Sequence, residues 1–326
     1  MNSSQDDNST KQSPETAIKF WGAVKKNRIY LVLISLAVVV PLVVLHSMYG
    51  LHPLHLQKTL RHALHREHLT FAMCVIAKDE RGIGEWVEYH KRKGCGKFYI
   101  YDNDSEIPMS IYISKYIEDG TVVYIPTKRN ETLAYTSPIV YSKNHCVDNF
   151  GHLHNWMGLL DADEFIVTDD NKSIPDVLHD FEGFGGVVLN WMTFGSSGLI
   201  DSPKTVLGPH YTKCQPDFHV KPIVNPASVS FCPSSHFCRY YYPHISVNID
   251  KEIVPQKTWH SDSVKVHKMY INHYTIKSLE DFKRKQKRGN GDDYPVRPDS
   301  YFEAVDKDMR LECSPLLMPL EFAPEG

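Results

Sequence analysis

Short apolar runs that end in polar turns recur along the middle of the chain. They lie at residues 71–77, 97–101, 121–125, 156–160 and 186–190. A short apolar run of this kind is typical of a strand buried within a sheet. Segments with helical spacing separate these runs, at residues 83–93, 133–149 and 174–181, and Pro138 interrupts the second of them. Strands that alternate with helices predict an α/β fold with a mixed, largely parallel sheet flanked by helices.

A further strand and helix are predicted towards the carboxyl end. Apolar and polar residues alternate over residues 266–274, as they do in a strand. Ser278 and Asp281 resemble a capping box at the start of a helix that runs to Gly289. Five cations lie between Lys283 and Arg288. They form either a solvated helix face or a clamp for a diphosphate group.

An uninterrupted apolar stretch near the amino terminus has the length of a membrane span. It covers residues 29–45 and continues to residue 51 beyond His46. Lysine and arginine residues precede it, which places the amino-terminal side in the cytosol and the rest of the chain in the lumen. A cleaved signal peptide is the alternative, but its apolar core is normally shorter. We therefore expect an uncleaved signal anchor.

Composition narrows the possible function classes. The chain has 326 residues, 42% of them hydrophobic, and a formal net charge of −3. No nucleic-acid partner is expected, because such a partner normally requires a basic field. The seven cysteines include no C-x-x-C pair, which argues against a structural zinc site. In an oxidising compartment Cys232 could pair with Cys238 or with Cys214.

Acidic residues stand directly after the apolar run at residues 156–160. Asp161 and Asp163 are separated by the small Ala162, and Glu164 follows. In open α/β sheets, ligands bind at the carboxyl ends of the strands. Paired carboxylates on a tight turn suit Mg²⁺ or Mn²⁺, whose coordination shell water and substrate phosphates complete. The alternative is a solvated acidic turn or a helix N-cap.

The first two apolar runs also end in polar clusters. Residues 78–80 follow the first run, and residues 102–105 follow the second. Polar groups at several strand ends are expected of a nucleotide-binding half-domain, here without a G-x-G-x-x-G phosphate loop. Further on, residues 191–198 (WMTFGSSG) mix aromatic, glycine and hydroxyl residues. That segment is either a wall on which a sugar ring stacks or an ordinary glycine-rich loop with a buried tryptophan.

A set of short motifs runs in order through residues 70–290. It consists of Lys78–Glu80 (KDE), Glu85–His90 (EWVEYH), Tyr101–Ser105 (YDNDS), Asp161–Ile166 (DADEFI), Phe194–Gly198 (FGSSG), and His273 and Tyr274 with Lys277. Together these motifs resemble glycosyltransferase family 92. The resemblance implies a GT-A fold in a single-pass type II protein of the Golgi membrane, with a lumenal catalytic domain. It also implies a UDP-sugar donor, often UDP-galactose, a glycan or polysaccharide acceptor, and inversion at the anomeric carbon.

The resemblance and the residue chemistry together assign roles. Asp161, Asp163 and Glu164 are expected to be catalytic. Asp161 and Asp163, with His273, are expected to hold Mn²⁺ or Mg²⁺. The donor site would include Lys78, Glu80, Asp102, Asn103, Asp104 and Lys277, and the acceptor site Trp191, Phe194, Gly195, Ser196 and Ser197. Inversion requires a general base, and the candidates are Glu164, Asp201, Asp217 and Asp262. Lys283 and Arg284 are further candidates for phosphate contacts.

These expectations divide the chain into six segments. They are a cytosolic tail (1–28), a transmembrane anchor (29–51), a stem (52–69), a nucleotide-sugar-binding half (70–190), an acceptor-binding part (191–310) and a tail (311–326). Leucines at helical spacing favour an amphipathic stem over a histidine-rich metal-binding tract. If lumenal, Asn130 and Asn171 are expected to carry glycans. Asn103 also lies in a sequon, but we expect it to stay unmodified within the donor site.

Two other function classes are compatible with the residues alone. A membrane-anchored carbohydrate-binding protein without catalysis would keep the aromatic segment and need neither metal nor nucleotide. A nucleotidyltransferase or phosphotransferase also uses paired acids. Such an enzyme would normally have a glycine-rich phosphate loop or a lysine early in the chain.

Overall fold

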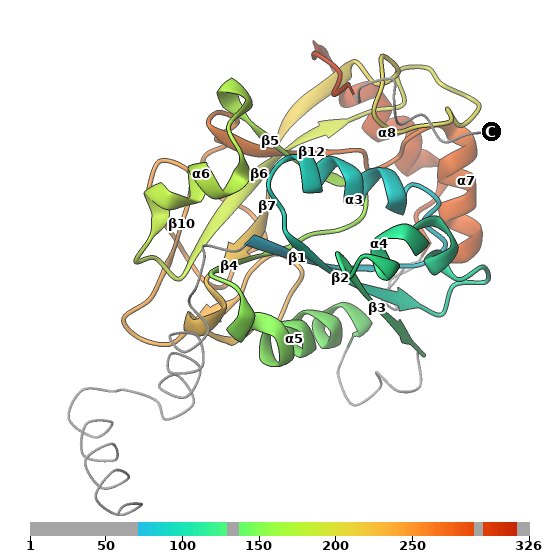
Figure 1. Ribbon diagram of the computed structural model, residues 1–326. Coiled ribbons are helices and arrows are strands. Elements are labelled where there is room, and N and C mark those ends of the chain that lie inside the picture. Colours follow the sequence, from blue (N-terminus) through green and yellow to red (C-terminus); the bar gives the residue numbers. More distant parts are fainter. Residues whose placement is uncertain (1–70, 129–136, 290–295, 318–326) are drawn as a thin grey trace, which may run out of the picture. The chain divides into compact units, whose positions relative to one another are not determined.

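The structure is a computed structural model that describes residues 71–128, 137–289 and 296–317 (Figure 1). The predicted cytosolic tail, transmembrane anchor and stem lie outside these ranges. None of the helices within these ranges reaches the length and hydropathy of a membrane-spanning segment.

One mixed sheet of eleven strands runs through the described part of the chain. Its main path has the order β11-β10-β6-β7-β4-β1-β2-β3, and β5, β12 and β13 attach to that path. Its strands are β1 (Phe71–Ala77), β2 (Lys97–Asn103), β3 (Val122–Thr127), β4 (Trp156–Leu159), β5 (Glu164–Thr168), β6 (Gly186–Phe194), β7 (Lys213–Val224), β10 (Ser246–Val247), β11 (Ile253–Val254), β12 (Met269–His273) and β13 (Leu311–Glu312). A separate ladder joins β8 (Val229–Phe231) to β9 (Arg239–Tyr240).

Strand direction divides the sheet into two parts. The strands β4, β1, β2 and β3 are parallel, so their carboxyl ends meet at one edge. Strand β7 is antiparallel to both β4 and β6, and β12 lies between β5 and β6. The mixed sheet flanked by helices that the sequence predicts is therefore confirmed. The expectation that the sheet is largely parallel is wrong, because β7, β11, β5 and β13 pair antiparallel with their neighbours. The turn that carries Asp161 and Asp163 follows β4, next to the boundary between the two parts.

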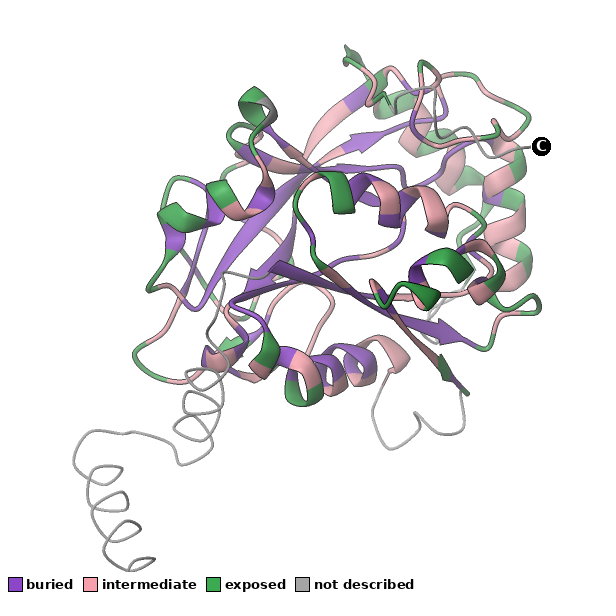
Figure 2. Cartoon of the chain, in the orientation of Figure 1, coloured by how far each residue is buried: buried purple, intermediate pink, exposed green. Residues whose placement is uncertain are grey.

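Helices cover both faces of this sheet (Figure 1). They are α3 (Ile83–Arg92), α4 (Ser114–Glu118), α5 (Pro138–Phe150), α6 (Ile174–Leu178), α7 (Leu279–Arg288) and α8 (Asp299–Asp308), with short 3₁₀ turns η1 (Met109–Tyr112), η3 (Gly151–Leu153), η4 (Asp169–Asn171), η5 (His179–Phe181) and η6 (Pro226–Ser228). Side chains along β1 alternate between two cores, as the strand period of two requires. Phe71, Met73 and Val75 pack in the core that includes α3, whereas Ala72 and Cys74 pack in the core that includes α5. Figure 2 shows the strands buried between helices that keep an exposed side.

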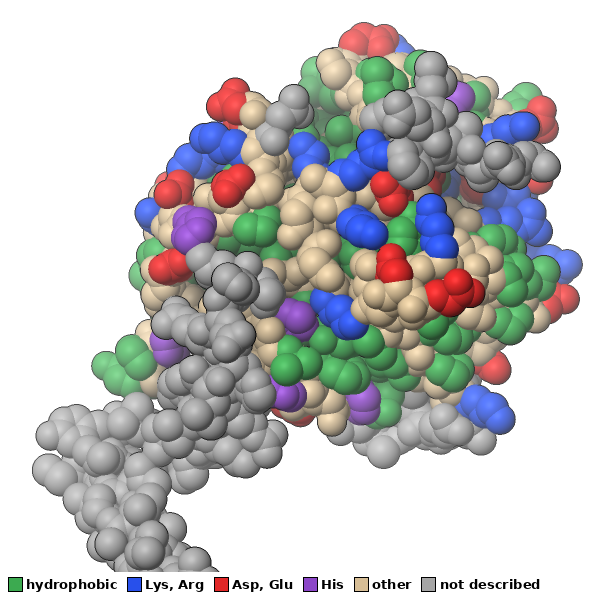
Figure 3. Space-filling model, in the orientation of Figure 1, with side chains coloured by type: hydrophobic (Ala, Val, Ile, Leu, Met, Phe, Trp, Pro, Cys, Tyr) green, Lys and Arg blue, Asp and Glu red, His purple; other side chains and the backbone are tan. Residues whose placement is uncertain are grey.

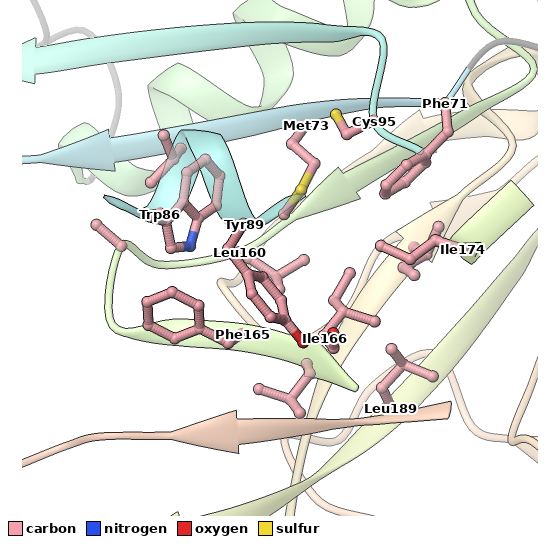
Figure 4. Packing of buried hydrophobic residues seen from close by; sticks show 14 of the residues in the cluster. Phe71, Met73, Trp86, Tyr89, Cys95, Leu160, Phe165, Ile166, Ile174 and Leu189 are labelled. Carbon is pink, nitrogen blue, oxygen red and sulfur yellow. Dashed lines mark hydrogen bonds between the residues drawn. The ribbon is translucent and has the colours of Figure 1, made fainter. Parts of the chain in front are cut away.

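Helix α3 fixes the start of β5. The Trp86 indole donates a hydrogen bond of 2.8 Å to the backbone carbonyl of Glu164, and the Tyr89 hydroxyl donates one of 2.8 Å to that of Ile166. Both rings are buried and contact the strand beside Phe165, as Figure 4 shows. Because β5 begins directly after Asp163, these contacts also hold one end of the acidic turn.

Helix α5 differs from the prediction at its amino end. Pro138 was expected to interrupt a helix over residues 133–149, but it is the first residue of α5. A proline is tolerated there because its missing N–H would have no partner within the helix. Ser137 caps the helix by accepting a hydrogen bond from the Ile139 amide at 3.2 Å. Residues 133–136 lie outside the described ranges.

Two disulfides connect the second half of the chain. The predicted bond between Cys232 and Cys238 is present, and it excludes the alternative between Cys214 and Cys232. Cys214 on β7 is instead bonded to Cys313, 99 residues further along the chain. Leu311 and Glu312, which were expected within a tail, form β13 and pair with β7.

Candidate active site

The acidic turn between β4 and β5 is held from three directions. The Glu164 amide donates a hydrogen bond of 3.2 Å to the carbonyl of Asp161, and the Tyr274 amide donates one of 2.9 Å to the carbonyl of Asp163. The Asp161 amide donates one of 2.8 Å to the Glu164 carboxyl group. The backbone of the turn that carries the Asp161 and Asp163 carboxylates is therefore held by contacts within the turn and by Tyr274, directly after β12.

Each of the two carboxylates forms an ion pair with a lysine. Lys221 of β7, buried and only 1% exposed, places its Nζ 2.5 Å from Asp161 Oδ2. Lys285 of α7 places its Nζ 2.5 Å from Asp163 Oδ2. Burial raises the pKa of both aspartates, but the nearby lysines outweigh burial and keep each pKa below its usual value. Both aspartates are therefore ionised at neutral pH.

Glu164 supports the turn and does not face a ligand. Its side chain is fully buried, and burial together with the charges of Asp161 and Asp163 raises its pKa to about 8. Lys221 Nζ lies 3.4 Å from its Oε1, which has no hydrogen-bond partner in the described structure. Glu164 was one of four candidates for the general base, and its full burial disfavours that role, because a base must reach the acceptor hydroxyl. Its assignment as a catalytic residue stays a prediction.

His273 faces Asp163 across a gap. Its Nε2 lies 3.8 Å from Asp163 Oδ1, which is too long for a hydrogen bond. Burial lowers the pKa of His273 to about 4, so the imidazole is neutral and can donate a lone pair to a cation. Its buried Nδ1 has no hydrogen-bond partner in the described structure. Two electron-pair donors that face each other at this distance fit one divalent ion.

A complete metal cage is not formed by protein groups alone. The described ranges contain no group of three or more histidine, cysteine or acidic side chains arranged to hold a metal ion. Both aspartates already pair with a lysine, but Asp163 also faces His273, so Asp163 and His273 are the better-placed pair. The ligand set of Asp161, Asp163 and His273 therefore stays a prediction.

Two cavities meet at the carboxyl ends of the parallel strands. The smaller has a volume of about 190 Å³ and the larger about 760 Å³. The smaller is lined by Asn103, Asp161 and Asp163, and the larger by Asp104 and Lys277. Both are lined by Lys78, Glu80, Lys285 and Arg288. Seven of the predicted site residues are thus brought together at one edge of the sheet.

The turns that follow β1 and β2 form one wall of the larger cavity. The Asp79 amide donates a hydrogen bond of 2.8 Å to Ser105 Oγ, and the Glu106 amide donates one of 2.8 Å to Asp79 Oδ1. Asp79 and Asp104 adopt left-handed backbone conformations, with φ of 48° and 58°. Such conformations are uncommon for residues other than glycine, and they occur often at functional sites.

Asp102 does not belong to this wall. Its carboxylate accepts hydrogen bonds from the amides of Ser105 and Met109, at 3.0 and 2.9 Å, and from the Tyr124 hydroxyl at 2.5 Å. The side chain is buried and lines neither cavity. The donor contact of Asp102 stays a prediction, and in this structure its oxygens instead fold the turn after β2. The neighbouring Asn103 keeps a buried Oδ1 that no described group bonds.

The larger cavity has a mixed but mainly basic lining. Its cations are Lys78, Arg81, Lys204, Lys277, Arg284, Lys285, Lys287 and Arg288, and its acids are Asp79, Glu80, Asp104, Glu106, Glu280 and Asp281. Lys and Arg side chains gather over α7, at the right of the view in Figure 3. The predicted contact residue Arg284 lies in this lining, whereas Lys283 pairs with Asp299 at 2.5 Å outside it. A cavity with this excess of cations suits a phosphate-bearing ligand.

Trp191 lies on the opposite side of the acidic turn from β2. Its ring centroid is 4.0 Å from that of His273 and 4.7 Å from that of His219, on which it stacks. Lys221 Nζ lies 5.9 Å from the same ring. The register between β6 and β7 shifts between Asn190 and Trp191. Such β-bulges change the direction of a side chain and are common beside active sites.

The other predicted acceptor residues have structural roles. Phe194 is buried and stacks on Tyr274 at 4.8 Å. Ser196 is also buried, and its amide donates a hydrogen bond of 2.7 Å to Asp306 of α8. A Cβ atom on Gly195 would lie 2.7 Å from the same Asp306 carboxylate, so glycine permits this close approach.

Ser197 completes the attachment of this segment to the sheet. Its Oγ accepts hydrogen bonds from the amides of Thr212 and Lys213, at 2.9 and 3.1 Å. The acceptor role assigned to residues 194–197 stays a prediction, and the contacts of these residues in the structure support the fold. They extend β6, close the turn that follows it and hold α8 against the sheet.

Sequence reasoning assigned no role to several residues of the site. No local pattern indicates a role for Lys221, because its pairing with Asp161 depends on the antiparallel contact of β7 with β4. Lys285 and Arg288 belong to the five cations from Lys283 to Arg288, but the sequence does not indicate which of the five face the cavity. The predicted glycan site Asn130 lies outside the described ranges, and Asn103 is buried at the end of β2.

Comparisons with known proteins identify the family. Residues 68–312 match the family described as Glycosyltransferase family 92. A glycosyltransferase family 92 protein of Oryza sativa subsp. japonica is 27% identical over 241 residues, which are 69% of this chain and 37% of that protein. A glycosyltransferase family 92 protein of Ricinus communis is 27% identical over 230 residues, 65% of this chain and 36% of that protein. The matches thus span little more than a third of the length of these relatives.

Solved structures of S. aureus TarS residues 1–349 are also similar. The complex with UDP has a TM-score of 0.32 at 12% identity, and covers 49% of this chain and 47% of that chain. A second structure of TarS 1–349 has a TM-score of 0.35 at 9% identity, and covers 73% of this chain and 69% of that chain. The family match extends over most of the described sheet and includes the acidic turn, both cavities and the Trp191 contacts. The chain therefore belongs to glycosyltransferase family 92.

Proposed function

We propose that this protein is a GT-A glycosyltransferase that moves a hexose from a UDP-sugar to a glycan acceptor with inversion. One observation carries the proposal. The paired carboxylates Asp161 and Asp163 line a cavity that adjoins a basic cavity at the carboxyl ends of β1 and β2. This is where open α/β sheets bind nucleotides. Galactose is the first sugar to test, because the family resemblance favours UDP-galactose.

The donor would lie across the two cavities. The unpaired Oδ1 of Asn103 can accept a hydrogen bond from the uracil N–H or from a ribose hydroxyl. Lys277 and Arg288 are placed to neutralise the diphosphate. Lys277 is held by an ion pair of 3.0 Å with the buried Glu80, so its position does not depend on the ligand. Fixed cations of this kind stabilise the charge that develops on the leaving oxygen.

A divalent ion would add to that stabilisation. Asp163 and His273, with Asp161, would hold it, and it would act as a Lewis acid on the diphosphate. Lys285 occupies the second oxygen of Asp163, so the protein itself supplies part of the positive charge beside the turn.

The proposal is tested by donor turnover with the full-length chain in detergent. We expect slow release of UDP from UDP-galactose, or from another sugar of a UDP-sugar panel, with Mn²⁺ and its loss with EDTA. Asp163→Asn is expected to lower turnover by roughly 100-fold or more, because a charge that acts in the transition state is lost. Asp180→Asn, at an exposed acid within η5, is the matched control.

The outcome separates the function classes. UDP binding with metal-independent turnover would remove the metal from the proposal and leave the transferase. Neither UDP binding nor turnover of any donor would favour the alternative of a membrane-anchored carbohydrate-binding protein. The proposed type II orientation in the Golgi membrane has its own test, because only a lumenal domain would carry endoglycosidase-sensitive glycans at Asn130 or Asn171.

A further inference from the structure

A histidine and an aspartate form a hydrogen-bonded pair beside the active site. His219 Nδ1 lies 2.6 Å from Asp217 Oδ1, and the His219 amide donates a second hydrogen bond of 2.9 Å to the same oxygen. Thr193 donates a third, of 3.2 Å, to Asp217 Oδ2. The carboxylate is therefore fixed by three donors, and it holds the imidazole in a single orientation. Such a contact keeps the proton on Nδ1 and leaves the lone pair on Nε2.

The other ring nitrogen of His219 is available. No hydrogen bond to Nε2 is formed by any group of the described residues, and about a third of the side chain (35%) is exposed. The ring is fixed by Trp191 at 4.7 Å and by Trp259 at 4.5 Å, while His236 lies 5.8 Å away. Trp259 is half exposed, so an aromatic surface borders the free nitrogen. Carbohydrate rings commonly pack their apolar faces on exposed aromatic side chains of this kind.

The fold places this pair across the acidic turn from the nucleotide cavities. In the sheet order, β1, β2 and β3 lie on one side of β4, and β7 and β6 lie on the other. His219 belongs to the same strand as Lys221, which binds Asp161, and it stacks on Trp191, which contacts His273. The irregular register between β6 and β7 falls at residues 217–220, next to the pair. A base in an inverting transfer acts from the side opposite the leaving diphosphate, and β7, which carries His219, lies across β4 from the strands whose ends line the nucleotide cavities.

The remaining candidates fit less well. Glu164 is buried, and Asp201 lies beside Ser202, which lines the larger cavity on the nucleotide side. Asp262 is exposed, and no described group orients its carboxylate. Asp217 itself is directed at His219 and Thr193, so it orients the imidazole instead of reaching the substrate.

From this geometry we infer that His219 is the general base of the transfer and that Asp217 is its positioning residue. His219 Nε2 removes the proton of the acceptor hydroxyl as that oxygen attacks the anomeric carbon. The bond from that carbon to the diphosphate oxygen breaks, and the nucleoside diphosphate leaves with the electron pair. The acceptor sugar packs against Trp259. This inference rests on the proposed function, because it names the base of that reaction.

The test uses donor hydrolysis by the full-length chain, in which water takes the place of the acceptor. His219→Ala is expected to lower UDP release from the UDP-sugar by roughly 100-fold or more, with UDP affinity unchanged. Added imidazole is expected to restore part of the rate. Asp217→Asn is expected to lower kcat without raising KM for the donor. The control is His267→Ala, because His267 also pairs with an aspartate, Asp250, at 2.8 Å but on another part of the surface.

The results separate the two proposals. Donor hydrolysis by His219→Ala within about twofold of the wild-type rate would overturn the base assignment, and so would a lost rate that imidazole does not restore. If His219→Ala does not fold, His219→Gln provides the same comparison of rate against UDP affinity. Failure of the proposed function would instead appear in the wild-type protein, as absence of both UDP binding and donor hydrolysis.

Discussion

At the scale of single residues, burial keeps one histidine of α3 neutral, and that histidine holds β5, the strand that directly follows the acidic turn. His90 of α3 is fully buried, its Nδ1 donates to the carbonyl of Trp86 at 2.9 Å, and its Nε2 accepts from the amide of Ile166 at 3.1 Å. Burial lowers its pKa to about 3. A proton on Nε2 would break the bond to β5, so the folded protein strongly favours the neutral imidazole.

This arrangement predicts loss of stability in mild acid. The unfolded chain takes up a proton at His90 near pH 6.5, whereas the folded chain does not until about pH 3. The unfolded state therefore binds more protons below pH 6.5, and the free energy of unfolding falls as the pH is lowered. The contribution of His90 is about 2 kcal/mol between pH 7 and pH 5.

Urea denaturation at the two pH values measures this contribution. His90→Gln is the comparison, because glutamine does not titrate. The difference in free energy of unfolding between the wild type and this variant should be smaller at pH 5 than at pH 7 by the same ~2 kcal/mol. A gap that stays constant with pH would show that His90 is protonated in the folded protein.

At the scale of elements, the long-range disulfide determines how the carboxyl-terminal segment is held. The bond between Cys214 and Cys313 closes a loop of 99 residues, whereas that between Cys232 and Cys238 closes one of six. Loop-closure entropy grows with the logarithm of loop length, so loss of the first bond should cost about 2–3 kcal/mol more than loss of the second. The exposed β13 has few other contacts that would compensate.

The double variants Cys214→Ser/Cys313→Ser and Cys232→Ser/Cys238→Ser provide a matched pair. Thermal unfolding of both should show the larger loss for the first pair, and limited proteolysis should cut that variant near α8 before the rest of the chain. Equal destabilisation by the two variants would contradict the loop-length argument.

The elements themselves were largely predictable, because each strand from β1 to β4 is a short apolar run bounded by polar residues. Prediction failed where distant segments determine the structure. Phe194 is buried because β6 continues as far as that residue and pairs with β7, and no local pattern indicates that pairing. The pairing of Cys214 with Cys313 and the attachment of α8 also depend on contacts about 100 residues apart.

At the scale of the whole molecule, the candidate site combines groups of two kinds. Asp161, Asp163 and Asn103 stand at the ends of parallel strands, and their spacing and position within the sequence revealed them. Lys221 and His219 come from the antiparallel part of the sheet, and only the tertiary structure brings them to the acidic turn. Asp102 was predicted to contact the donor and Glu164 to be catalytic, but the oxygens of both accept hydrogen bonds from neighbouring turns, so both support the site in this structure.

The sheet order also predicts where a nucleotide changes the dynamics of the protein. If UDP occupies the two cavities, amide hydrogen exchange should slow at residues 77–82, 103–107, 161–163 and 277–288, which contribute to the cavity linings. Residues 217–219 should not change, because they lie across β4 from the nucleotide. Exchange of the full-length chain in detergent, measured with Mn²⁺ and with or without UDP, checks this expectation. Asp163→Asn should reduce this UDP-dependent slowing of exchange, which would show that the effect depends on the acidic turn. Slower exchange at residues 217–219, without any change at the strand ends, would contradict the division of the sheet into a nucleotide side and an acceptor side. It would place the donor beside His219, the proposed base.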